Sequence, residues 1–131
     1  MANVPSHDQV GDVVEQVTAI WERDLGVTTA REAANQLDWT IEVRQLLTPS
    51  SKIRSLLFAE PTGGFSIVIN AQHRPSVNRQ EWLIAHEFAH SLFFSPHYPP
   101  RRIISHSEEE EAFCDAFANM AIRQRALRAA S

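Results

Sequence analysis

The sequence predicts an α+β protein in which a helical N-terminal part, a small three-stranded and mainly antiparallel sheet, and two further helices follow one another. Three observations support this fold class. Apolar residues recur every three or four positions near the start, three short segments in the middle suit strands, and helical patterns return afterwards. We expect the 131 residues to form a single domain, with flexible segments at residues 1–7 and from about residue 124 to residue 131.

Composition excludes several classes of protein. The formal net charge is −4 and no stripe of Lys and Arg is present, so we expect no direct binding to nucleic acid. No segment approaches the ~20 apolar residues of a membrane span, and the start lacks the apolar stretch of a signal peptide. The single cysteine, Cys114, cannot form an internal disulfide bond and is typical of a reducing compartment. These features indicate a cytoplasmic protein without a membrane partner.

Two helices are predicted in the opening part of the chain. Residues 8–26 carry valines and other apolar residues at helical spacing, and the pattern ends near a glycine. A second, shorter helix is expected over residues 30–37, with Thr28 or Thr29 as its N-cap. We interpret Trp21 as a core residue of this helical part rather than as part of a binding surface.

The period of the sequence changes after the second helix. Residues 40–46 alternate polar and apolar side chains, and residues 54–58 and 65–70 are further short apolar segments. The connections at residues 48–51 and 61–64 contain proline, glycine and serine, which are typical of turns. Three consecutive strands joined by short turns predict a small antiparallel meander.

The next predicted helix carries a motif with metal-binding chemistry. It is expected to run from an N-cap at Asn78 to about Phe94 and contains the match His86-Glu87-Phe88-Ala89-His90 to H-E-x-x-H. The two histidines are four residues apart, so both imidazoles lie on one helix face and can reach the same ion. Zinc suits this pattern because three protein ligands leave a fourth position open, and Glu87 is then placed to act on water.

Chance could also produce such a motif, in which case the histidines would be surface residues or hydrogen-bonded core residues. The flanking sequence argues against chance. It is apolar almost all round the helix, which indicates a buried helix. Burying Glu87 costs several kcal/mol unless a positive charge compensates for it. A metal ion would provide that charge, so the sequence favours a site for one Zn²⁺ per chain.

The last predicted helix offers the third ligand. It begins at about residue 107 and continues to about Ile122, with positive charges following. Glu111 and Asp115 lie four residues apart on a face whose later residues are small or apolar, so this carboxylate pair needs a partner. We predict Glu111 as the ligand and Asp115 as the group that orients one histidine. The alternative third ligands are Glu110, His97 and His106.

Three segments together resemble one known group, the ImmA/IrrE-type zinc metallopeptidases. They are the strand Ser-Ile-Val-Ile-Asn at residues 66–70, the HEFAH helix, and the run E-x-x-C-D-x-F-A at residues 111–118. The likeness covers roughly residues 64–122. The chain differs from the usual pattern in having Cys114 where alanine is common, and it lacks the Leu-Met-Pro ending after the last helix. Neither difference affects a metal ligand.

The resemblance implies a gluzincin-like zinc endopeptidase with zinc on His86, His90 and Glu111 and with Glu87 as the general base. It also implies a typical substrate, a helix-turn-helix transcriptional repressor, which would be encoded nearby and whose cleavage derepresses genes. The alternative is a non-cleaving, zinc-binding anti-repressor module of the same fold. A zinc-free helical adaptor would require the motif to be a coincidence.

Two sets of residues are candidates for assisting peptide hydrolysis. A peptidase holds its substrate extended, and an exposed strand can do so by backbone pairing. The strand with Ser66, Val68 and Asn70 is a candidate for this edge, although it could equally be purely structural. A group besides zinc must stabilise the oxyanion. The candidates are Tyr98, His97 and His106.

Overall fold

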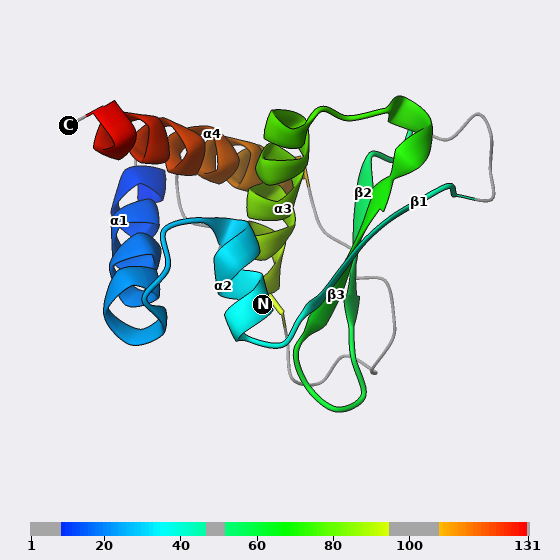
Figure 1. Cartoon of the computed structure of the whole chain (residues 1–131), viewed down its shortest axis with the longest axis horizontal. Coiled ribbons are helices and arrows are strands. Elements are labelled where there is room, and N and C mark those ends of the chain that lie inside the picture. The colour runs from blue at the N-terminus through cyan, green and yellow to red at the C-terminus, as the bar shows by residue number, and fades with distance from the viewer. Residues whose placement is uncertain (1–8, 47–51, 95–107, 131) are drawn as a thin grey trace.

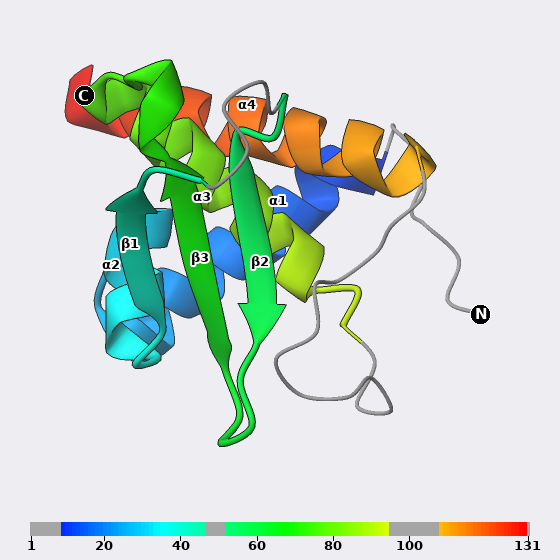
Figure 2. The same ribbon diagram turned by 90° about the vertical axis from the view of Figure 1, so that its right-hand side faces the viewer.

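The structure is a computed structural model that describes residues 9–46, 52–94 and 108–130, with side chains described as far as Arg123. The described residues form four α-helices, two short helices of other types and one three-stranded sheet (Figure 1). The α+β fold class predicted from the sequence is therefore confirmed. Helix α3 lies between the sheet on one side and the helices α1 and α4 on the other (Figures 1 and 2).

The first helical segment has two parts. Helix α1 spans Val10–Ile20, and a π-helical turn, η2, continues it over Trp21–Leu25. Gly26 ends the segment in the left-handed conformation with φ 67°, which glycine adopts without steric cost. This end agrees with the sequence prediction, and Trp21, only 3% exposed, is a core residue as expected. Helix α1 packs against α4.

Helix α2 spans Ala30–Gln36 and begins with a capping box. The Thr29 hydroxyl oxygen accepts a hydrogen bond from the Glu32 backbone N–H at 3.1 Å, and the hydroxyl donates to Glu32 Oε1 at 2.9 Å. Of the two predicted caps, Thr29 is therefore the N-cap residue. Arg31 on the same helix forms an ion pair with Glu81 of α3 at 2.6 Å, which ties α2 to α3.

The sheet is mixed, and its strand order differs from the predicted meander. Strands β1 (Thr40–Arg44), β2 (Ser55–Ala59) and β3 (Phe65–Asn70) occur in the spatial order β1-β3-β2. Strand β3 pairs in parallel with β1 and antiparallel with β2 (Figure 2). The connection from β1 to β2 is too long for a tight hairpin, which leaves room for β3 between the two strands.

Burial explains why β3 takes the central place. Its last four residues, 67–70, are all buried, whereas four of the five residues of β1 are exposed. Because β3 is paired on both sides, Ser66, Val68 and Asn70 cannot form a free edge for a substrate, and that expectation is wrong. Asn70 is fully buried and structural, since its backbone N–H donates to Arg54 O and its side-chain amide donates to Ile53 O, each at 2.9 Å.

The hairpin between β2 and β3 has one glycine that the fold requires. Gly64 has φ 75°, and a Cβ atom at this position would lie 3.2 Å from Cδ1 of Trp39. Both the backbone conformation and the close approach therefore favour glycine. Trp39 in turn stacks on Phe88 of α3, with ring centroids 5.0 Å apart.

The last two helices differ from the sequence prediction at their ends. After the short helix η3 (Ala71–His73), α3 spans Val77–Ser91. Its N-cap is Ser76, whose hydroxyl oxygen accepts a hydrogen bond from Arg79 N, and not the expected Asn78. The helix ends near Leu92, not at Phe94.

Helix α4 spans Glu108–Ala130, so its backbone stays helical well beyond the expected end at Ile122 and through most of the segment from residue 124. Its expected cap at residue 107 lies outside the described residues, as do residues 1–7. Within the part of the chain that the structure describes, no helix is both long and apolar enough to cross a membrane.

Candidate metal centre

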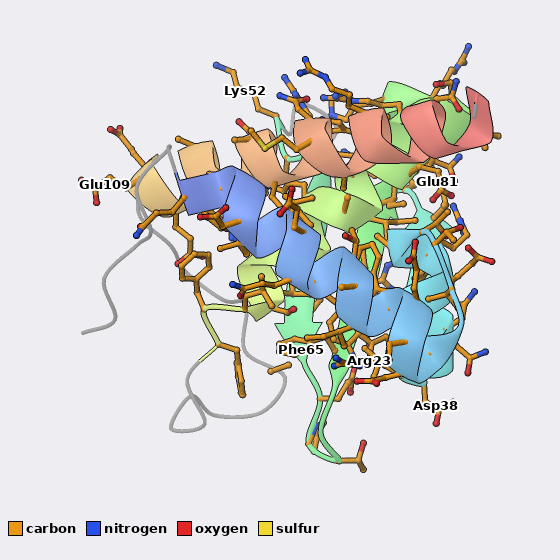
Figure 3. The ribbon with its side chains drawn as sticks, turned by 90° about the vertical axis from the view of Figure 1, so that its left-hand side faces the viewer. Arg23, Asp38, Lys52, Phe65, Glu81 and Glu109 are labelled. Carbon is orange, nitrogen blue, oxygen red and sulfur yellow. The ribbon has the colours of Figure 1, made fainter. Side chains whose placement is uncertain are left out.

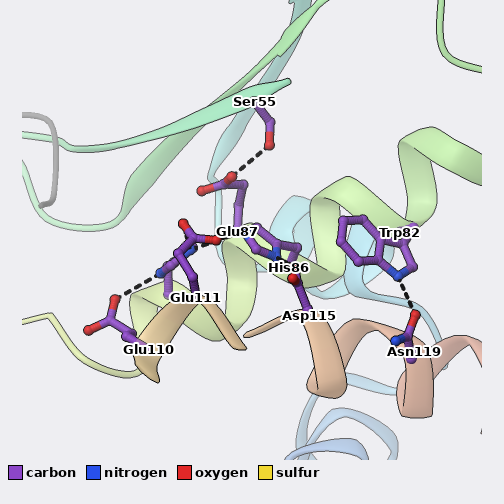
Figure 4. A network of polar contacts seen from close by, with 9 residues as sticks. Ser55, Trp82, His86, Glu87, Glu110, Glu111, Asp115 and Asn119 are labelled. Carbon is purple, nitrogen blue, oxygen red and sulfur yellow. Dashed lines mark hydrogen bonds and ion pairs between the residues drawn. The ribbon is translucent and has the colours of Figure 1, made fainter. Parts of the chain in front are cut away.

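The candidate metal centre lies where α3 and α4 pack against each other (Figure 4). Helix α3 contributes His86 and His90 on the face that meets α4, and α4 contributes Glu111 from its first turn. The spacing of four residues on α3 places both imidazoles on one side of the helix, as the sequence predicted. One potential ligand atom from each of the three residues lies within 4.8 Å of the others, a grouping that could hold a metal ion.

The distances within this triad are short enough for a shared metal ion. Nε2 of His86 and Nε2 of His90 are 3.1 Å apart, and Glu111 places one carboxylate oxygen 3.1 Å from the His90 nitrogen and the other 3.2 Å from the His86 nitrogen. Ligands at about 2.0–2.1 Å from zinc in tetrahedral geometry are separated by about 3.3 Å. The separation of the two imidazole nitrogens is close to that value.

Each histidine also contacts a carboxylate through its other ring nitrogen. His90 Nδ1 lies 2.8 Å from Glu110 Oε2, and His86 Nδ1 lies 2.9 Å from Asp115 Oδ1. A carboxylate in this position favours the tautomer in which Nδ1 carries the proton, which leaves Nε2 free to bind a metal. Asp115 lies where the sequence prediction put it, beside one histidine.

Glu110 contacts a histidine ring and does not lie at the position of a third metal ligand. It was an alternative third ligand in the sequence interpretation, but its carboxylate approaches the outer nitrogen of His90 rather than the Nε2 pair. Of the four successive glutamates, Glu110 alone is buried. The signal was present in the sequence, because position 110 is in register with the buried Phe113, Cys114 and Phe117 at i+3, i+4 and i+7.

Glu87 points from α3 toward Ser55 of the sheet (Figure 4). It is 4% exposed, and its Oε2 accepts a hydrogen bond of 2.6 Å from the Ser55 hydroxyl on β2. Burial raises the pKa of Glu87 to about 7, although the Ser55 hydrogen bond and the charge of His90 act in the opposite direction. Ser55 was not found from the sequence, because its position depends on how β2 pairs with β3.

Electrostatics around His90 favour its protonated form when no metal is bound. Burial alone would lower the pKa of His90, but the hydrogen bond to Glu110 and the negative charges of Glu87 and Glu111 outweigh it, so the pKa is raised. The negative surroundings therefore favour a positive charge at this position.

An aromatic side chain covers one side of the histidine pair. The Trp82 ring stacks on the His86 ring with centroids 5.3 Å apart and planes 19° apart. Trp82 Nε1 donates to Asn119 Oδ1 of α4 at 2.7 Å (Figure 4), which fixes the ring between the two helices. Trp82 was read from the sequence only as part of an apolar flank, and its position four residues before His86 was the available signal.

The two helices differ in how far they bury their residues of the site. The His90 side chain is 1% exposed, whereas the side chains of Glu111 and Asp115 are 44% and 52% exposed. The α3 part of the site is therefore buried, and its α4 carboxylates are partly exposed to solvent. The candidates for oxyanion stabilisation, Tyr98, His97 and His106, lie outside the described residues.

No protein-family model, no curated protein and no solved structure matches this chain. The resemblance to the ImmA/IrrE-type metallopeptidases therefore depends on the three sequence segments quoted above. The function is inferred from how His86, His90 and Glu111 lie together.

Proposed function

We propose that this chain is a zinc-dependent endopeptidase that hydrolyses a peptide bond of a protein substrate. The observation that carries the proposal is the triad of His86, His90 and Glu111, whose Nε2 and carboxylate atoms are 3.1–3.2 Å apart. Glu87, the neighbour of His86 in the motif, is buried next to them and is not one of the three ligands. Two imidazoles and one carboxylate are a ligand set of catalytic zinc sites.

In this proposal the metal and Glu87 have different roles in hydrolysis. When bound, zinc supplies Lewis acidity, which polarises a carbonyl group and lowers the pKa of water to about 7. Glu87 accepts the proton of the attacking water at its carboxylate and passes it to the leaving amine.

Ser55 and the outer carboxylates hold these groups in place. The Ser55 hydroxyl donates to one oxygen of Glu87, which leaves the second oxygen available for water. Glu110 and Asp115 hold the histidine rings through their Nδ1 atoms and keep both Nε2 atoms directed at the same point.

Strand β2 is the part of the sheet that suits an extended substrate. Among the described residues, it pairs with β3 on one side only, and it lies against α3 with Ser55 beside Glu87. A peptide added along this edge would pair through its backbone and pass next to the general base. This assignment replaces the expected edge on β3. From the family resemblance, the proposed substrate is a cytoplasmic helix-turn-helix repressor.

The test combines metal content with cleavage of a peptide library. We expect one zinc per wild-type chain, and a fall in zinc affinity of at least about a thousandfold in Glu111→Ala, because two ligands alone hold zinc weakly. Glu87→Gln should retain zinc and lose cleavage by at least about a thousandfold, since the water then lacks its base. Glu109→Gln is the matched control, because Glu109 is exposed and points away from the fold (Figure 3).

Three outcomes would contradict the proposal in different ways. Zinc retained by Glu111→Ala would move the third ligand elsewhere. Zinc bound by the wild type without cleavage of any library peptide or candidate repressor would support a zinc-binding module that captures its partner without cutting it. No zinc in any variant, even after zinc is supplied, would exclude the enzyme.

A further inference from the structure

A small basic pocket lies at the end of the sheet where β2 begins. Its volume is about 130 Å³, and it is lined by Arg54, Asn70, His73, Pro75, Arg79 and Leu83. These residues come from three places in the chain: the segment entering β2, the end of β3 with the η3 turn, and the first two turns of α3. Figure 1 shows the η3 turn and the start of α3 at this end of the sheet.

The pocket lies next to the contact between β2 and α3, on the N-terminal side of Glu87 along the helix. Leu83 lies four residues before Glu87, on the same face of α3, and Arg79 lies one turn further away. Arg54 immediately precedes Ser55, the residue whose hydroxyl binds Glu87. At about 1.5 Å of rise per helical residue, the pocket begins roughly 6 Å and ends roughly 12 Å from Glu87 along the helix.

The positive charge of this pocket is not balanced by the chain. Its lining includes two arginines and one histidine and no carboxylate. Within the described residues, Arg54, His73 and Arg79 form no ion pair with Asp or Glu. This is unusual in a chain with a net charge of −4, whose metal centre a short distance away is rich in carboxylates.

The donors that remain for a ligand are those of the arginines. The Asn70 side chain is already used, because its amide donates to Ile53 O and its oxygen accepts from Gln72 N. Arg79 lies over the Trp82 ring, 4.3 Å from its centroid, so its planar guanidinium is oriented while its N–H groups stay free for an anion. Two guanidinium groups around a small cavity suit a carboxylate, which they bind with paired hydrogen bonds.

We propose that this pocket binds a carboxylate group of the peptide substrate, and that the enzyme therefore prefers acidic peptides. The inference rests on the proposed peptidase function and names its substrate class. An extended peptide advances about 3.3 Å per residue, so the distance to the pocket corresponds to roughly two to four residues from the scissile bond. The carboxylate comes either from an Asp or Glu side chain at that position or from the C-terminus of the substrate.

The first experiment measures cleavage of a random peptide library by the zinc-loaded wild type. We expect cleaved sites to be enriched about tenfold for Asp or Glu two to four residues from the cut, on one side only. The double variant Arg54→Glu and Arg79→Glu should reverse the preference to Lys or Arg at the same position. Arg23→Glu, an exposed charge change on the η2 turn, whose residues do not line the pocket, should keep the wild-type preference.

Free-acid and amidated forms of the same peptides separate the two sources of the carboxylate. An advantage for free-acid peptides alone assigns the pocket to the substrate C-terminus, whereas an advantage that survives amidation assigns it to a side chain. Cleavage with no acidic preference in either form overturns the inference and leaves the proposed peptidase function standing.

A binding measurement tests the pocket without catalysis. N-acetyl-glutamate methylamide is titrated into the ¹⁵N-labelled, metal-free protein, and the signals of the His73 ring and neighbouring amides are followed. We expect saturable shifts that the glutamine analogue does not produce and that the double variant loses. Equal shifts with both analogues overturn the inference. Selective binding together with an absence of cleavage supports the pocket and contradicts the peptidase function.

Discussion

The two sides of α3 are packed in opposite ways. On the side facing the sheet and the opening helices, Phe88 lies between Trp21 and Trp39, with ring centroids 5.1 and 5.0 Å away. On the side facing α4, His86 and His90 lie among three carboxylates of that helix, those of Glu110, Glu111 and Asp115 (Figure 4).

The difference separates contacts that stabilise the fold from contacts that could hold a metal ion. Burial of aromatic rings stabilises the fold whatever is bound. The other side concentrates negative charge around two imidazoles, a grouping that favours a cation. A fifteen-residue helix with nine buried residues thus combines a structural side with a side that could hold a metal ion.

The largest expected effect comes from breaking the aromatic side. Phe88→Ala should lower the free energy of unfolding by about 3–5 kcal/mol, because a buried ring is replaced by a cavity. The zinc affinity of the folded fraction should change by less than about threefold, as Phe88 contacts none of the ligands. Urea unfolding followed by circular dichroism, with zinc and with chelator, measures both quantities.

Leu92→Ala is a suitable control for that experiment, because Leu92 is 45% exposed at the end of the same helix. It should cost less than about 1 kcal/mol. If Phe88→Ala weakened zinc binding as strongly as Glu111→Ala does, the two sides of α3 could not be treated as separate.

The second prediction concerns how the free energy of unfolding of the metal-free protein depends on pH. The pKa of Glu87 is about 7 in the folded state against 4.5 when unfolded, so the folded state binds this proton more tightly. Stability should therefore fall as pH rises from 4.5 toward 7, by roughly 3 kcal/mol in total. The raised pKa of His90 acts in the same direction, because its contribution is present below 6.5 and is lost as pH rises through the folded value.

Urea unfolding in the presence of chelator at pH 5 and at pH 8 measures this dependence. Glu87→Gln should remove the larger part of it, since the amide does not titrate. The same stability at both pH values in the wild type would show that Glu87 is not buried as the structure places it.

The smallest effect is expected from a change in the outer carboxylates. Glu110→Ala should weaken zinc binding about 10- to 100-fold, because His90 loses the group that holds its tautomer and orientation. Glu109→Ala, the exposed neighbour on the same helix turn, should leave zinc affinity unchanged. Isothermal titration against a competing chelator distinguishes them. Complete loss of zinc in Glu110→Ala would make Glu110 itself the ligand.

Features that depend on neighbouring residues could be predicted from the sequence. The helices, the capping box at Thr29 and the stop at Gly26 follow from local spacing and backbone preference. The pairing of His86 with His90 on one face follows from the same four-residue spacing. Glu111 could be predicted as a ligand because a pair of carboxylates on an apolar helix face needs a positively charged partner.

Features that depend on strand order could not be predicted in this way. Alternation identifies the strands but does not say which of them are neighbours, so β3 was expected at an edge and proved to be central. Ser55 was missed for the same reason, because it reaches Glu87 only when β2 pairs with β3 in the register that sets Ser55 opposite Ile69.

The central position of β3 also has a consequence for the order in which the protein folds. Strands β2 and β3 are joined by a five-residue turn at residues 60–64, so their pairing closes a short loop. The pairing of β1 with β3 joins Thr40 to Ser66 across a longer loop and costs more entropy. We expect the hairpin to form first and β1 to add to it later. All three strands are complete once residue 70 is synthesised, whereas Glu111 is made 41 residues later, so the three residues that could hold a metal ion come together only after the sheet is complete.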